Sequence, residues 1–263
     1  MTIFQAIIYG IIQGAGEFLP ISSSGHLIAI PQLLGWADHG LEFDIALHWG
    51  TLVAVLIYFW HDWTLLLKGG MRGTGTRDGK MFWYLIAATI PGAVAGYLLD
   101  NVVESYFRNV GLVGISLIIM GMVLYLCDRY GRQQVNLQQM TFWQSLWIGL
   151  SQALAIVPGV SRSGSTISCA RILGLDRESA ARFSFLLSTP IIFGSAIIPL
   201  KKILQSGLSV PLGYFVIGML TAAIIGLLCI KFFLQYLKKA DLVIFVWYRF
   251  VFGAILLLFY YAS

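Results

Sequence analysis

Six stretches of this sequence are long and apolar enough to cross a membrane as helices. A spanning α-helix needs about 20 mainly apolar residues, because the hydrocarbon core of a bilayer is roughly 30 Å thick. Of the 263 residues, 58% are hydrophobic and 11% are charged, whereas soluble domains carry about 25% charged residues. We therefore expect an all-α polytopic membrane protein that forms a single membrane domain over residues 1–263. The spans are expected at residues 43–65, 81–99, 110–127, 183–200, 211–235 and 243–262.

Two further apolar stretches, residues 1–37 and 142–173, are interrupted by polar residues at their centres. The first contains "QGAGEFLPISSSGH" (residues 13–26) and the second contains "QALAIVPGVSRSGST" (residues 152–166). A charged side chain at the bilayer centre costs at least ~2.5–3.5 kcal/mol, and non-helical backbone is tolerated there only inside protein or beside a watery cavity. We therefore expect two re-entrant helical hairpins, each of which breaks at its polar centre and returns to the side from which it came.

The order of hairpins and spans predicts an inverted repeat. Three spans follow each hairpin, and because three is odd, the second hairpin enters from the opposite face. The repeats would be residues 1–130 and 140–263. Their matching positions are Gln13, Pro20, Ser22, Ser24 and Gly25 in the first and Gln152, Pro158, Ser161, Ser163 and Gly164 in the second, with a slip of one residue. Sites in such repeats form where broken helices meet near the midplane, so we expect Glu17, the serines, His26 and Arg162 to converge.

Lysine and arginine are distributed unevenly between the two faces of this layout. Eleven fall on one side and three (Arg108, Lys201 and Lys202) on the other, while the rest lie inside or near spans. By the positive-inside rule the eleven-residue side is cytoplasmic, which turns both termini and the mouth of the first hairpin outward. The same asymmetry accounts for the net charge of +5 without a nucleic-acid partner. The eleven are Lys68, Arg72, Arg77, Lys80, Arg129, Arg132, Arg171, Arg177, Arg182, Lys238 and Lys239.

The second polar run, "SRSGST", contains the groups of an anion site. Arg162 supplies a permanent planar charge with five N–H donors, and Ser161, Ser163 and Thr166 add hydroxyls. Pro158 and the neighbouring glycines favour a break, after which a helix would begin with free backbone N–H groups that favour an anion. The alternative is that the hydroxyls only cap this helix and that Arg162 pairs with a buried carboxylate.

The first polar run offers a different set of groups. Gln13 and Glu17 are four residues apart and therefore share one helix face, where they could reach a divalent cation or a proton. His26 is a candidate general acid or base. One of the serines at 22–24 could be a nucleophile, which needs a base nearby. The alternative is a Glu17–Arg162 pair that only holds the hairpins together, with a satisfied core histidine beside it.

Carboxylate, hydroxyl, imidazole and guanidinium groups at mid-membrane indicate phosphoryl transfer or phosphate binding, and an apolar wall around them indicates a lipid that carries the phosphate. Arg249 lies inside the last expected span, where it would pair with Glu17 or contact the substrate. His48 opens the first expected span, and we expect an interfacial or packing role for it.

The two polar runs also carry a family resemblance. "QGAGEFLPISSSGH" resembles the Glu/Gln-x-x-x-Glu stretch and the following segment of the undecaprenyl pyrophosphate phosphatases, the BacA or UppP family, and "PGVSRSGST" resembles their second signature. "FSFLLSTP" at 183–190 and "YRF" at 248–250 match as well, in the same order over essentially the whole chain. The resemblance implies hydrolysis of undecaprenyl pyrophosphate at the bacterial inner membrane, which recycles the lipid carrier of peptidoglycan synthesis and confers bacitracin resistance. It also implies six spans with two re-entrant hairpins, a periplasm-facing site, and Mg²⁺ or Ca²⁺ dependence.

Carried over residue by residue, the resemblance also implies roles in the site. The expected metal ligands are Gln13 and Glu17, and the expected catalytic residues are Glu17, Ser23 as nucleophile, His26 and Arg162. The resemblance places Ser161 with Arg162 at the pyrophosphate-binding pair. From the residues themselves we also expect substrate binding by Ser22, Ser24, Ser163, Thr166 and Arg249. Two positions depart from the family pattern. Gln13 is a neutral amide where some members carry a carboxylate, and Ser24 stands where threonine is common, which leaves a second candidate hydroxyl.

Three alternatives stay open at this point. Inverted repeats with broken helices are also transporter architecture, so the chain could instead flip undecaprenyl phosphate or another anionic lipid. Hydrolysis could proceed through a serine nucleophile or by direct attack of water. The chain could also act as a monomer or as a homodimer.

Overall fold

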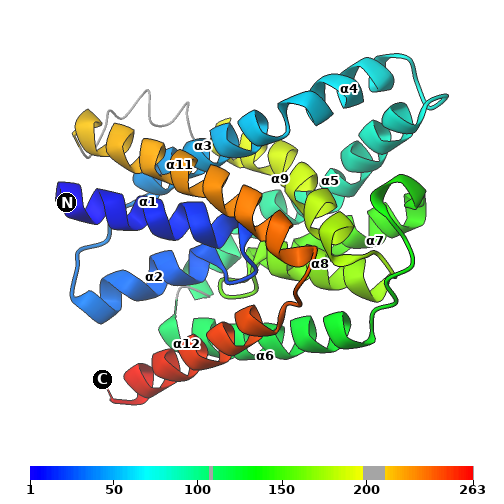
Figure 1. Ribbon diagram of the computed structural model, residues 1–263. Helices are drawn as coiled ribbons and strands as arrows, with labels where there is room; N and C mark the ends of the chain where they lie inside the picture. Colours follow the sequence, from blue (N-terminus) through cyan, green and yellow to red (C-terminus); the bar gives the residue numbers. More distant parts are fainter. Residues whose placement is uncertain (107–108, 198–210, 263) are drawn as a thin grey trace.

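The computed structural model describes residues 1–106, 109–197 and 211–262, which are mainly helical (Figure 1). Within these ranges the only β-pairing is an isolated bridge between Val135 and Leu175. The expected all-α class is confirmed. The α-helices are α1 (Ile3–Phe18), α2 (Ser23–Leu34), α3 (Leu41–Tyr58), α4 (Trp60–Met71), α5 (Arg77–Tyr106), α6 (Val110–Tyr130), α7 (Phe142–Gln152), α8 (Arg162–Ile172), α9 (Arg177–Ile197), α11 (Leu212–Leu237) and α12 (Val243–Ala262). Two short 3-10 helices are η1 (Leu137–Gln139) and η2 (Ala153–Ile156).

Four helices in the described ranges are long and apolar enough to cross a membrane. They are α6, α11, α12 and the first 23 residues of α5, and they coincide with four of the six expected spans. Their outer surfaces expose large apolar side chains such as Tyr97, Trp247 and Leu258. Apolar patches of this extent are rare on soluble monomers, so this surface is one that lipid covers and the protein is a multi-pass membrane protein.

The expected span at residues 43–65 is not one straight helix. α3 ends at Tyr58, α4 begins at Trp60, and the two axes meet at an angle of 78°. Phe59, between them, is fully buried, with its ring centroid 6.5 Å from that of Phe185 on α9. The expected span therefore corresponds to a bent helix pair, and no proline or glycine stands at the bend.

Part of the expected layout lies outside the described residues. α9 covers the expected span at 183–200 as far as Ile197, and residues 198–200 lie beyond the described range. The three basic residues assigned to the outer side, Arg108, Lys201 and Lys202, lie outside it as well.

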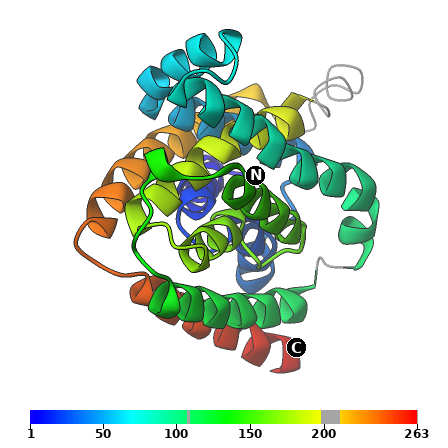
Figure 2. The same ribbon diagram turned by 90° about the vertical axis from the view of Figure 1, so that its right-hand side faces the viewer.

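Each of the two polar runs interrupts a helix, as expected. α1 ends at Phe18 because Leu19, which precedes a proline, is extended (φ −72°, ψ 144°). α7 continues into η2 and ends before Val157, which also precedes a proline and is also extended (φ −72°, ψ 120°). α2 and α8 then start the second limb of each pair. Figure 2 shows these two broken pairs in the middle of the molecule, ringed by the long helices.

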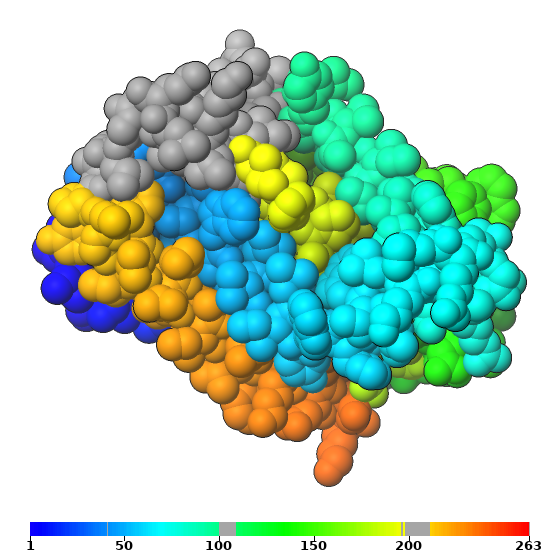
Figure 3. Space-filling model, turned by 90° about the horizontal axis from the view of Figure 1, so that it is seen from above, coloured from blue at the N-terminus to red at the C-terminus, as the bar shows by residue number. Residues whose placement is uncertain are grey.

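The long helices pack closely against the broken pairs and against one another. α11 lies against both α1 and α3, and α7 lies against α5. Figure 3 shows α3 (blue) between α11 (orange) and α9 (yellow). A Cβ atom at Gly50 of α3 would lie 2.3 Å from the Met219 carbonyl oxygen of α11, and one at Gly149 of α7 would lie 2.2 Å from the Ala88 carbonyl oxygen of α5. Glycine at these positions is what allows the backbones to approach, as is usual between membrane helices.

A buried charge network joins the C-terminal ends of α6 and α8 to the N-terminal end of α9. The Asp128 carboxylate accepts hydrogen bonds from Nε of Arg171 at 2.8 Å and from Nη2 of Arg177 at 3.0 Å, and from the Leu242 backbone N–H at 3.3 Å. The Arg171 side chain is fully buried. Arg171, one of the eleven basic residues expected on the cytoplasmic side, is thus a structural cation held by a carboxylate.

Candidate active site

The breaks of the two helix pairs contact each other directly. The Gly159 backbone N–H donates to Ser22 Oγ at 3.2 Å, and Ser163 Oγ donates to the Leu19 carbonyl oxygen at 2.9 Å. Residues about 140 positions apart in the chain are therefore neighbours, as the repeat argument predicts. Both serines were expected in the site, and each of them joins one hairpin to the other.

Both breaks end in the same local structure. Ser22 and Ser161 have positive φ angles (74° and 72°), and they are the only residues other than glycine in the described ranges that do so. Each caps the helix that follows, because its Oγ accepts the N–H of the third residue along, Gly25 at 3.3 Å and Gly164 at 3.1 Å. Such strained backbone is concentrated at functional sites. The N-termini of α2 and α8 thus meet in the middle of the molecule, where their dipoles favour an anion.

Glu17, near the end of α1, is the shared acceptor of the site. Its Oε2 accepts from Ser23 Oγ at 2.8 Å and from Gln13 Nε2 at 3.0 Å, while its Oε1 forms an ion pair with Arg162 Nη2. The carboxylate is almost completely buried, and Gln13 is fully buried. The expected pairing of Glu17 with a cation is present, and the cation is Arg162. Arg249 is not its partner.

A cavity of about 220 Å³ opens beside these groups. Arg162 Nη1 is buried and has no hydrogen-bond partner within the described part of the chain, so it is free to bind a ligand there. Six of the expected site residues line the cavity, and they are Glu17, Ser22, Ser23, Ser24, Ser161 and Arg162. Its remaining wall is formed by Gly16, His48, Gly92, Gly96, Gln152, Ala155, Ile156, Ile191, Ile192 and Ser195. The cavity therefore combines one carboxylate, one guanidinium and several hydroxyls with an apolar wall.

His26 is buried but does not line the cavity. Its Nδ1 donates to the Ser22 carbonyl oxygen at 2.7 Å, which can only accept, so Nε2 accepts from the Tyr248 hydroxyl at 2.6 Å. Its ring also stacks on Phe252 with centroids 4.3 Å apart. Both ring nitrogens are therefore occupied, and no hydrogen bond joins His26 to Ser23 or Glu17 in the described structure.

Arg249 is fully buried and binds backbone carbonyl groups. It donates to the carbonyl oxygens of Pro20 at 2.9 Å, Gly159 at 2.7 Å, Val160 at 2.9 Å and Leu117 at 3.2 Å. The first three belong to the two breaks. Arg249 is not among the residues that line the cavity. The geometry therefore makes it a clasp that holds both breaks in place.

Thr166, which was also expected in the site, is engaged away from the cavity. Thr166 Oγ1 donates to the Arg162 carbonyl oxygen at 2.8 Å and is 2.7 Å from Ser184 Oγ. It therefore helps to fix α8 against α9. Ser24, by contrast, is exposed at the cavity, and its Oγ is 3.3 Å from Ser22 Oγ.

The structure adds three polar residues to the cavity that were not expected in it, and they are Gln152, His48 and Ser195. Gln152 is buried, and neither its Oε1 nor its Nε2 has a partner in the described ranges. Its only signal in the sequence is its match to Gln13 in the repeat. His48 lines the cavity from α3, and no motif surrounds it. Gly92 of α5 leaves room for the amide, because a Cβ atom there would lie 2.7 Å from Gln152 Nε2.

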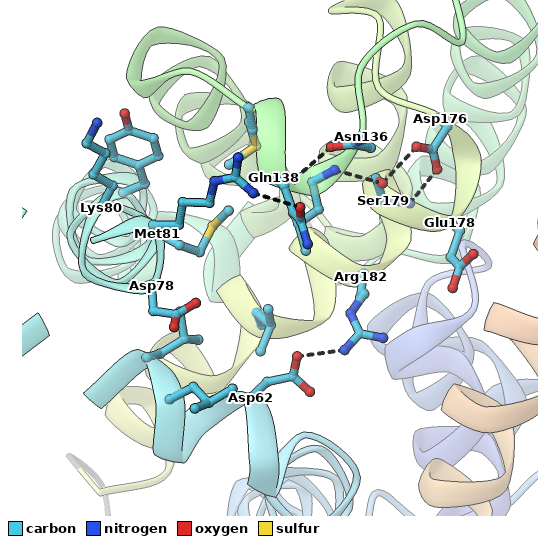
Figure 4. Close-up of a pocket in the computed structure, with 17 residues that line it drawn as sticks. Asp62, Asp78, Lys80, Met81, Asn136, Gln138, Asp176, Glu178, Ser179 and Arg182 are labelled. Carbon is cyan, nitrogen blue, oxygen red and sulfur yellow. Dashed lines mark hydrogen bonds and ion pairs between the residues drawn. The ribbon is translucent and has the colours of Figure 1, made fainter. Parts of the chain in front are cut away.

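A larger pocket of about 620 Å³ lies at the other end of the helices, among the loops expected on the cytoplasmic side. Figure 4 shows Asp62 of α4 and Arg182 of α9 pointing toward each other in it, at 2.6 Å. Arg77 Nη1 also donates to Gln138 Oε1 at 3.1 Å. No residue lines both this pocket and the smaller cavity, so the two spaces are separate.

Comparison with known proteins gives one family over most of the chain. Residues 6–255 match the family described as "Bacitracin resistance protein BacA". The chain is 52% identical over 253 residues to an undecaprenyl-diphosphatase of Desulforudis audaxviator, with 96% of each chain covered. It is 50% identical to one of Pelotomaculum thermopropionicum, with 96% of this chain and 95% of the relative covered, and 47% identical to one of Moorella thermoacetica, with 97% of each covered.

Proposed function

This chain belongs to the family of the bacitracin resistance protein BacA, and from that premise we propose that it hydrolyses undecaprenyl diphosphate to undecaprenyl phosphate and inorganic phosphate. Relatives that are 43–52% identical over nearly the full chain carry the name undecaprenyl-diphosphatase. The reaction recycles the lipid carrier of peptidoglycan synthesis and confers bacitracin resistance.

The observation that carries this proposal is the hydrogen bond from Ser23 Oγ to Glu17 Oε2 at 2.8 Å. A serine hydroxyl is a weak nucleophile until an adjacent base accepts its proton. In the mechanism, Ser23 Oγ attacks the terminal phosphorus and its proton passes to Glu17. The bond from that phosphorus to the bridging oxygen breaks, and undecaprenyl phosphate leaves.

Charge stabilisation comes from the second hairpin. Arg162 holds Glu17 through Nη2 and offers its unpaired Nη1 to the phosphate oxygens. The N-termini of α2 and α8 add backbone dipoles in the same place. Preorganised donors of this kind are usually the largest single contribution to phosphoryl transfer. The rest of the polar lining is formed by Ser22, Ser24, Ser161, Ser195, Gln152 and His48.

The size of the cavity supports a lipid substrate bound by its head. Its volume of about 220 Å³ is below the roughly 300–1,000 Å³ of pockets that enclose a drug-sized ligand. The diphosphate would therefore fill it, and the polyprenyl chain would leave past the apolar wall at Ala155, Ile156 and Ile191 into the bilayer.

A divalent cation, Mg²⁺ or Ca²⁺, fits the oxygen atoms present at one edge of the site. Gln13 Oε1 is buried without a partner in the described structure, and Glu17 is the neighbouring carboxylate. Both ions prefer oxygen ligands, and Mg²⁺ in particular is often held by one or two protein groups together with substrate phosphates. When bound, the cation would neutralise charge on those phosphates. Gln13 and Glu17 would hold it.

We also propose the finer architecture. The six spans would be the bent α3–α4 pair, α5, α6, α9, α11 and α12, with α1–α2 and α7–α8 as re-entrant hairpins. The packing supports an inverted repeat, because α1 lies on α11 and α7 lies on α5, which are equivalent helices in the two halves. Lys and Arg counts support a bacterial inner-membrane orientation with outward termini and a periplasm-facing catalytic cavity.

The test is phosphate release from undecaprenyl diphosphate by the purified protein in detergent, with and without EDTA. Ser23→Ala is expected to reduce release by at least about a hundredfold, because it removes the attacking atom. Ser168→Ala is the matched control, since Ser168 is equally buried in α8 but does not line the cavity. Release by the folded protein that Ser23→Ala leaves unchanged would reject the nucleophile. If the folded wild-type chain releases no phosphate, lipid transport becomes the favoured function.

A further inference from the structure

The proposed reaction has two steps, and the second step needs a base other than Glu17. After Ser23 has attacked, Glu17 holds the proton that Ser23 must receive back when the phosphoserine is hydrolysed. Its other oxygen is engaged by Arg162. Glu17 therefore cannot also take a proton from the water that attacks the phosphoserine. This inference rests on the proposed function and assigns that second step.

Among the described residues that line the cavity, Glu17 and His48 are the only two whose side chains carry a carboxylate or an imidazole, the usual general bases of enzymes. Arg162 keeps its charge, and the remaining polar residues are serines and Gln152. His26, the histidine of the sequence motif, lies outside this lining and uses both of its ring nitrogens elsewhere. His48 is therefore the remaining candidate.

The geometry of His48 suits a base. Its Nδ1 is 2.8 Å from the Asp44 carbonyl oxygen one turn earlier in α3. A carbonyl oxygen can only accept, so Nδ1 carries the proton and the lone pair of the neutral ring is on Nε2. Within the described ranges, the hydrogen bond at Nδ1 is the one that the His48 ring makes. The backbone beneath the ring is held in turn, because Thr51 Oγ1 donates to the His48 carbonyl oxygen at 3.0 Å.

We propose that His48 is the general base for hydrolysis of a phosphorylated Ser23. Water attacks the phosphorus and gives one proton to His48 Nε2. The bond from phosphorus to Ser23 Oγ breaks, and Oγ takes back the proton that Glu17 holds. The products are inorganic phosphate, the free Ser23 hydroxyl and the Glu17 carboxylate, and the His48 imidazolium then releases its proton to solvent.

The experiment compares His48→Gln with His61→Gln in the purified protein. His61 is exposed on α4 and does not line the cavity, so it is the matched histidine control. Undecaprenyl phosphate and inorganic phosphate are followed separately in the first turnover, and the protein is then examined for phosphate on Ser23 by mass spectrometry. The wild-type rate, measured in parallel, tests the proposed function itself.

His48→Gln is expected to release about one equivalent of undecaprenyl phosphate rapidly, to reduce steady-state phosphate release by about 10²–10⁴-fold, and to accumulate phosphoserine at Ser23. Added imidazole should restore part of the rate in His48→Ala, which separates loss of the base from misfolding. If the wild type is active and His48→Gln is as active as His61→Gln, the assignment of His48 is wrong. It is also wrong if His48→Gln is slow but accumulates no phosphoserine at Ser23. An inactive, folded wild-type protein rejects the proposed phosphatase instead.

Discussion

The Glu17 carboxylate interacts with three side chains. It accepts hydrogen bonds from Ser23 and Gln13 and forms an ion pair with Arg162. Glu17→Gln keeps the shape but removes the basic oxygen, so we expect kcat to fall by at least about a hundredfold. The fall should be seen in phosphate release by detergent-solubilised protein. The control is Glu178→Gln, which should keep full activity. Glu178 lies on the surface, where its Oε1 is 3.4 Å from Lys238 Nζ.

Gln152 allows activity and stability to be separated. A buried amide without partners is destabilising by about 1–3 kcal/mol, so Gln152→Leu should leave thermal stability unchanged or raise it. If the amide binds substrate oxygens, the same variant should raise KM about tenfold, which corresponds to roughly 1.4 kcal/mol. Steady-state kinetics and thermal unfolding together check this. An unchanged KM with a lower melting temperature would mean that Gln152 is only structural.

The sequence predicted the cluster at this scale well but not every role within it. Glu17, Ser23 and Arg162 converge as expected. Each is a polar side chain in an apolar stretch, where its burial costs free energy unless it has polar partners. His26 and Arg249 are just as polar, yet they contact Tyr248 and backbone carbonyls. Spacing along the chain cannot show which way a side chain points across a helix break. For the same reason it indicated only an interfacial or packing role for His48, which reaches the cavity from α3, outside both broken helix pairs.

Among the elements, α12 has a structural role beyond crossing the membrane. Its Arg249 donates to four backbone carbonyl groups, three of them in the breaks. In Arg249→Met these buried acceptors lose their donor, at about 1–3 kcal/mol each. We expect a loss of at least about 3 kcal/mol, measured by unfolding in mixed detergent micelles. Arg129→Met, at an exposed position in α6, is the control. Equal stability of the two variants would contradict the clasp.

Contact between α5 and α7 sets one wall of the cavity. In Gly149→Ala the new methyl group would overlap the Ala88 carbonyl oxygen, which lies 2.2 Å from it. The helices must separate, so we expect about 1–3 kcal/mol of destabilisation together with reduced activity, because Gln152 follows on the same helix. Gly213→Ala meets nothing within 4 Å and should be neutral or stabilising. Thermal unfolding of both variants provides the comparison.

The elements themselves were largely predictable. Helix breaks at prolines and serines are local chemistry, and they occur where the sequence places them. The 78° bend at Phe59 was not predictable, because both of its limbs are apolar and no proline or glycine stands there. Hydropathy reports how apolar a segment is, whereas the direction of a helix depends on what its buried side chains pack against.

On the scale of the whole molecule, the proposed orientation gives a direct prediction. After replacement of Cys127, Cys169 and Cys229, Thr2→Cys should react with a membrane-impermeant maleimide in intact spheroplasts. Arg132→Cys should react only after the membrane is opened, because the loop before α7 lies on the face that is expected to carry eleven of the lysine and arginine residues. The reverse labelling pattern would place the catalytic cavity on the cytoplasmic side and reject the periplasmic assignment.

The clasp formed by Arg249 also has a consequence for biosynthesis. Membrane proteins are inserted from the N-terminus as the chain is made, and Arg249 lies on α12, which follows both broken helix pairs in the chain. The backbone carbonyl groups at both breaks therefore lack this donor until α12 is inserted. Catalytic competence would appear only after that step, so a chain stalled or truncated before α12 should stay inactive toward the lipid carriers around it.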